Sequence, residues 1–73
     1  MKYLVVEIQT DSEGEVANIV TAYEKRNEAE SKYYTVLAAA AVSDLTIHGC
    51  MLMTNEGYPL LHYAYAKYGN MKE

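Results

Sequence analysis

Apolar residues follow two different spacings along this chain. Residues 3–10, 16–23, 46–54 and 58–65 are rich in β-branched, aromatic and other apolar side chains and are separated by turn-forming residues, which is typical of strands. Between the second and third runs, apolar positions recur at the spacing of one helical face: Ala29, Tyr33, Val36, Leu37, Ala40 and Ala41. The pattern predicts an α+β protein in ββαββ order, with a four-stranded, mainly antiparallel sheet and one helix packed on one face. It leaves the strand order open, because either the third or the fourth strand can lie beside the first.

Two similar turns lie within the predicted hairpins. Ser12-Glu13-Gly14 and Asn55-Glu56-Gly57 each end in glycine, which adopts the left-handed conformation of a three-residue loop without steric cost. These loops fix the register of both hairpins. The expected pairs are Val6 with Val20 in the first hairpin, and Leu52 with Leu60, Cys50 with His62 and His48 with Ala64 in the second.

The helix has recognisable boundary signals. Asn27 is a suitable N-cap, and Glu30, three residues later, can complete a capping box. Ser43 and Asp44 are expected to end the helix. A helix of roughly 15 residues spans about 22 Å, enough to cover a four-stranded sheet.

The two faces of the predicted sheet differ in apolar content. The more apolar positions, expected beneath the helix, are Leu4, Val6, Ile8, Val20, Ile47, Met51, Met53, Leu61, Tyr63 and Tyr65. The opposite face is expected to carry Tyr3, Val5, Ile19, Tyr23, His48, Cys50, Leu52, Leu60 and His62. A semi-apolar exposed face on a small protein marks a contact surface. We therefore expect these nine residues to form an interface with a second copy, in a two-fold dimer.

Length and composition favour self-association. The chain has 73 residues, which predicts one domain over 1–73 with a frayed tail at 66–73. Cys50 is the only cysteine, so an intramolecular disulfide cannot supply stability. We expect a cytoplasmic protein without a signal peptide or membrane span. The formal net charge is −4 and the six Lys and Arg residues are scattered, so nucleic acid is not an expected partner.

One group of residues could carry chemistry. If Cys50 faces His62 with His48 nearby, a thiol beside imidazole could form a nucleophile, and the three side chains could hold a metal. A regular strand in mid-sheet is a poor place for a nucleophile, and no fourth metal ligand is apparent. We favour packing for all three residues, and expect no catalytic residue, metal or cofactor.

Four segments carry a resemblance to other proteins: 18–23, 26–33, 35–43 and 51–58. Over most of its length, the chain resembles a group of short, uncharacterised proteins of gut bacteria and their phages or mobile elements. No activity is assigned to that group. The resemblance implies a phage-related accessory role, such as a structural component or an inhibitor of a host defence system.

The sequence favours a non-enzymatic interaction module, expected to be a homodimer that binds a protein partner. The alternative is a small-ligand binder, for example of nucleotides, with a pocket between two subunits lined by Tyr3, Tyr23, His48 and His62. An enzyme is the third possibility, and the least favoured.

Overall fold

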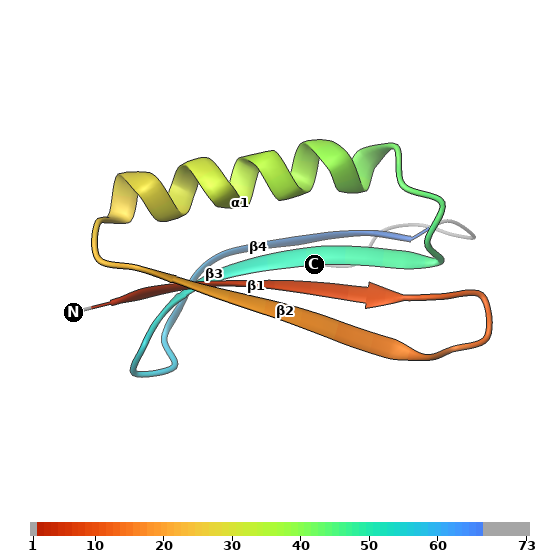
Figure 1. The fold of residues 1–73 in the computed structure, drawn as a ribbon, viewed down its shortest axis with the longest axis horizontal. Coiled ribbons are helices and arrows are strands. Elements are labelled where there is room, and N and C mark those ends of the chain that lie inside the picture. The colour runs from red at the N-terminus through yellow and green to blue at the C-terminus, as the bar shows by residue number, and fades with distance from the viewer. Residues whose placement is uncertain (1, 67–73) are drawn as a thin grey trace.

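The fold is a four-stranded antiparallel sheet with one helix along one face (Figure 1). The computed structural model describes residues 2–66. Its elements are β1 (Tyr3–Thr10), β2 (Val16–Tyr23), α1 (Arg26–Ala41), β3 (Ile47–Thr54) and β4 (Pro59–Ala66). The sheet order is β2-β1-β3-β4, so the strand that lies beside β1 is β3. The predicted α+β class and ββαββ order are confirmed. The predicted frayed tail lies outside the described residues, except for Ala66, which ends β4.

Both hairpin loops have the predicted geometry. Gly14 and Gly57 have φ angles of 85° and 94°, in the left-handed region that glycine tolerates. The Gly14 N–H donates to the Asp11 carbonyl at 3.0 Å, and the Gly57 N–H donates to the Thr54 carbonyl at 2.9 Å. The β1–β2 register follows as predicted, with Val6 opposite Val20.

The β3–β4 register departs from prediction after one pair. Met53 lies opposite Pro59, as expected, but a bulge follows and Leu52 lies opposite Leu61 instead of Leu60. Every later pair is shifted by one residue. Pro59 has no N–H for the ladder, which makes this end of β4 a natural place for a bulge. The predicted pairs Cys50 with His62 and His48 with Ala64 are wrong, since Cys50 pairs with Tyr63 and His48 with Tyr65.

Helix α1 begins before the predicted cap. Lys25 is the N-cap and makes no side-chain capping hydrogen bond, so the capping box of Asn27 and Glu30 is wrong. Glu30 instead accepts a 2.8 Å hydrogen bond from Arg26 Nε, one turn earlier. The predicted apolar stripe holds in its main part, because the buried helix residues are Ala29, Tyr33, Val36 and Ala40. Within residues 2–66, no helix is long and apolar enough to cross a membrane.

The face under the helix is the opposite of the predicted one for β1, β2 and β3, and Val20, predicted beneath the helix, lies on the other face and is exposed. Val5 and Leu52, which are 2% and 0% exposed, form the core with Cys50 and the buried helix residues. Tyr3, Tyr23 and Leu60 pack against this core, and His48 is buried on the same side of β3. Of the nine residues predicted to lie on the face away from the helix, only Ile19 and His62 are exposed. Leu61 packs against the core as predicted, because the bulge turns β4 by one residue.

Candidate functional site

The sheet face away from α1 carries no charged side chain within the described strands. We call it the open face. Strand alternation and the observed register assign it these positions: Leu4, Val6, Ile8, Thr10, Val16, Asn18, Val20, Ala22, Ile47, Gly49, Met51, Met53, Pro59, His62, Ala64 and Ala66. A solvated face of an antiparallel sheet normally alternates to polar and charged residues. In a chain with 22% charged residues, the composition of this face is the unusual feature of the molecule.

The most exposed large apolar side chains of the open face lie on β2. Val16 and Val20 are 65% and 56% exposed, and Ile8 on β1 is 37% exposed. Met51 and Met53 on β3 are half-buried. Exposed valine and isoleucine side chains on a flat sheet present apolar area to water without a polar tip, which favours contact with another apolar surface.

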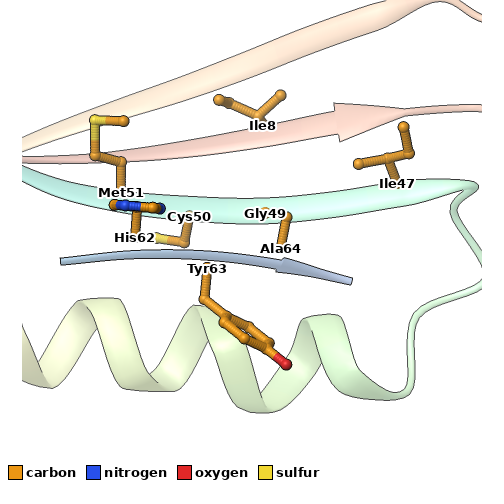
Figure 2. Close-up of a pocket in the computed structure, with 8 residues that line it drawn as sticks. All are labelled: Ile8, Ile47, Gly49, Cys50, Met51, His62, Tyr63 and Ala64. Atoms are coloured by element: carbon orange, nitrogen blue, oxygen red, sulfur yellow. The ribbon is translucent and has the colours of Figure 1, made fainter. Parts of the chain in front are cut away.

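A shallow hollow lies in the open face above Gly49, where a side chain is missing. Its volume is about 210 Å³. Figure 2 shows Ile8 and Met51 on the side of β3 away from the helix, whereas Tyr63 points towards α1. The residues that line the hollow are Ile8, Ile47, Gly49, Cys50, Met51, His62, Tyr63 and Ala64. His62 is the one imidazole among these mainly apolar residues.

A polar cluster lies on the covered face, between β1 and β3. His48 Nε2 and Glu7 Oε2 are 2.6 Å apart, and Gln9 Nε2 donates to the same oxygen at 3.0 Å. A carboxylate only accepts hydrogen bonds, so His48 Nε2 carries the proton. Burial alone would raise the pKa of Glu7, but the hydrogen bonds from Gln9 and His48, with the charges of His48 and Lys32, hold it below its ordinary value. The cluster is therefore an ionised, hydrogen-bonded carboxylate at the edge of the core.

Of the two ring nitrogens of His48, only Nε2 has a hydrogen-bond partner among the described residues. Its Nδ1 atom is buried and has no hydrogen-bond partner among residues 2–66. Sequence patterns did not reveal the Glu7–His48 pair, because these residues are 41 positions apart and meet only if β3 lies beside β1. The signal that could have found the pair is the two-residue spacing that places Glu7 on the same face as Val5, and His48 on the same face as Cys50.

Cys50 is unsuited to thiolate chemistry. The side chain is 3% exposed, and burial, followed by the nearby Glu7 carboxylate, raises its pKa to about 11. A nucleophile or metal ligand needs the thiolate, which this environment disfavours. His62 does not assist, because it lies opposite Met51 and points to the other face of the sheet. Residues 2–66 contain no group of three or more His, Cys, Asp or Glu placed to hold a metal ion.

The pocket expected for a small ligand is not assembled from its four predicted residues. Tyr3 and Tyr23 pack against the core beneath α1, and His48 is buried on the same side. His62 is exposed on the open face. Three of the four residues lie on the covered side of the sheet and the fourth on the open face, so the structure does not bring them together as predicted.

Comparison with known protein families, with curated proteins and with solved structures gives no match.

Proposed function

We propose that this protein is a non-enzymatic interaction module that works as an assembly of its own copies, with the open face as one contact. The observation that carries this proposal is the uncharged, apolar character of that face. A face without charge can meet its own copy across a two-fold axis without like-charge repulsion. The resemblance to phage-related proteins extends the proposal to an accessory role in phages or mobile elements, with a protein as the final partner.

The size of the open face is adequate for such a contact. Four strands about 4.8 Å apart and eight residues long, at about 3.4 Å per residue, give a face of roughly 500 Å² per copy. Two such faces bury about 1,000 Å², at the lower end for specific protein interfaces. Stacked sheets pack about 10 Å apart, so β-branched side chains of this length can interdigitate.

The test is the solution mass, measured by light scattering on a sizing column across a range of protein concentrations. Val6 and Met51 lie opposite each other on the central strands of the open face. Changing either to lysine places a charge at the centre of the contact, and we expect the mass to fall by half. Thr35→Lys, on the exposed side of α1, adds the same charge elsewhere and should leave the mass unchanged. An unchanged mass in both open-face variants would refute this contact.

A second candidate function is binding of a small molecule in the hollow above Gly49, which offers one imidazole and an apolar lining. The volume of about 210 Å³ is below the roughly 300 Å³ at which ligand pockets usually begin. The first proposal is therefore the stronger. A rise in melting temperature with nucleotides or other metabolites, abolished by His62→Ala, would support the second function. No shift across the panel would reject it.

A further inference from the structure

The outer edge of β2 is an unprotected strand edge. β2 pairs with β1 on one side, and no described residue pairs with it on the other. Natural edge strands are usually guarded by charged residues, proline, bulges or short length. The sequence of β2, VANIVTAY, has eight residues without charge or proline, and it pairs with β1 without a register shift. The other edge strand, β4, has both Pro59 and a bulge.

The direction in which the backbone groups of β2 point follows from two hydrogen bonds at the C-terminal end of β1. The Asp11 N–H donates to the Glu15 carbonyl at 3.1 Å, so the odd residues of β1 bond towards β2. The Thr10 carbonyl accepts from the Thr46 N–H at 2.9 Å, so the even residues bond towards β3. Because odd residues of β1 lie opposite odd residues of β2, the even residues of β2 direct their N–H and C=O groups to the free edge. These are Val16, Asn18, Val20 and Ala22.

One register pairs all of these free groups with a second copy. In an antiparallel arrangement with the two-fold axis at Ile19, Val16 of one copy lies opposite Ala22 of the other, and Asn18 lies opposite Val20. This register forms about eight backbone hydrogen bonds, since each hydrogen-bonded pair exchanges two. The two Ile19 residues then face each other as a non-hydrogen-bonded pair, with Cα atoms about 4.5 Å apart. That contact would cover a side chain that is 51% exposed in the single chain.

Charges at the two ends of β2 select an antiparallel second copy over a foreign strand. Glu13 and Glu15 precede the strand and Lys25 follows it; all three are exposed and have no ion pair among residues 2–66. The neighbouring Glu24 is already paired with Lys2 at 3.0 Å. In the antiparallel register, Lys25 of each copy approaches the acidic end of β2 in the other. The chain is thus complementary to itself at both ends of the strand.

We infer that β2 pairs with β2 of a second copy, in the register centred on Ile19, to form a continuous eight-stranded antiparallel sheet. This contact uses backbone groups at the sheet edge and goes beyond the open-face contact proposed above. In Figure 1, β2 is the strand that lies apart from α1, which leaves its edge accessible. With both contacts made and their two-fold axes crossing at right angles, the assembly closes at four copies.

Ile19→Lys tests the edge contact without altering the open face. It places two positive charges at the axis, and we expect the solution mass to fall by half while the far-ultraviolet circular dichroism is retained. Thr35→Lys is again the control for added charge. Combined with Val6→Lys, Ile19→Lys should give monomers. If Ile19→Lys keeps the wild-type mass, the edge contact is wrong, whatever Val6→Lys does alone; the two contacts therefore fail separately.

A charge exchange tests the orientation. Lys25→Glu should weaken the edge contact, and adding Glu13→Lys and Glu15→Lys to the same chain should restore it, because both ends then carry exchanged charges. Failure of this rescue would overturn the antiparallel register. Amide hydrogen exchange gives a direct readout. The N–H groups of Val16, Asn18, Val20 and Ala22 should be protected in the wild type and in Val6→Lys, and unprotected in Ile19→Lys. Fast exchange at these four positions in the wild type would also refute the pairing.

Discussion

Gly49 and Ala64 lie opposite each other on β3 and β4, and the two backbones are too close there for a side chain on both residues. A Cβ atom placed on Gly49 would be 2.7 Å from the Ala64 Cβ and 3.2 Å from the Tyr63 carbonyl oxygen. No real Cβ contact is this short, so the two strands would have to move apart. The missing side chain lets β3 and β4 pair closely and also creates the hollow in the open face.

Gly49→Ala should lower the free energy of unfolding by about 1–3 kcal/mol, the usual effect of overpacking a tight site. Ala64→Gly in the same chain removes the nearest clashing atom and should restore part of this loss. The measurement is urea unfolding of the wild type, both single variants and the double variant. Additive effects of the two substitutions would show that the Gly49–Ala64 contact is not the source of strain.

Val5 and Val6 are neighbours in sequence but should respond oppositely to a charge. Val5→Glu places a carboxylate in the core beneath α1, without a partner, and we expect the cooperative unfolding transition to be lost. Val6→Glu places the charge on the open face, and the fold should remain, with a smaller assembly. Circular dichroism and thermal unfolding distinguish the two results. The reverse outcome would mean that α1 covers the other face.

Glu7 should make the free energy of unfolding depend on pH in the acidic range. Its pKa is lowered in the folded protein, so its contribution is fully present above the ordinary pKa of 4.5 and is lost as the pH falls through the folded value. The free energy of unfolding should therefore decrease as the pH falls below about 4.5, and Glu7→Gln should reduce that decrease. Glu56→Gln, in an exposed turn, is the matched control. Equal slopes in the wild type and Glu7→Gln would contradict the role of the Glu7–His48 pair.

Cys50 should resist thiol reagents in the native protein. Burial and a pKa of about 11 leave little accessible thiolate at about pH 8. We expect slow labelling by an aromatic disulfide reagent, limited by opening of the structure, and rapid labelling in denaturing urea. Immediate, complete labelling of the native protein would place Cys50 outside the core.

Local chemistry made part of the fold predictable. Gly14 and Gly57 specified both loops because a three-residue turn requires a left-handed residue at one position. The spacing of Ala29, Tyr33 and Val36 identified the buried side of α1 correctly. These signals act over a few residues, so no tertiary contact has to be known to interpret them. The bulge after Pro59 had no such signal beyond the missing N–H.

The choice of covered face depended on a contact between distant strands. The face with Val6 and Met51 has the cleaner apolar pattern, whereas the covered face contains Glu7 and His48. Burial of polar groups is tolerated when they bond to one another, and these two do so at 2.6 Å. That compensation appears only once β1 and β3 are neighbours. Apolar content alone therefore favoured the wrong side, and the predicted interface residues were misplaced with it.

The position of β1 between β2 and β3 also imposes an order on folding. The β1–β2 and β3–β4 hairpins close over three-residue loops and can form locally, in about 1–10 μs. The β1–β3 ladder pairs Tyr3 with Thr54, so its formation closes a long loop of chain that contains β2 and α1. Loop-closure entropy makes such a non-local pairing the slow step. We expect the two hairpins to form early and the β1–β3 pairing between them to form later. Packing of α1 onto Val5 and Leu52 then completes the native state.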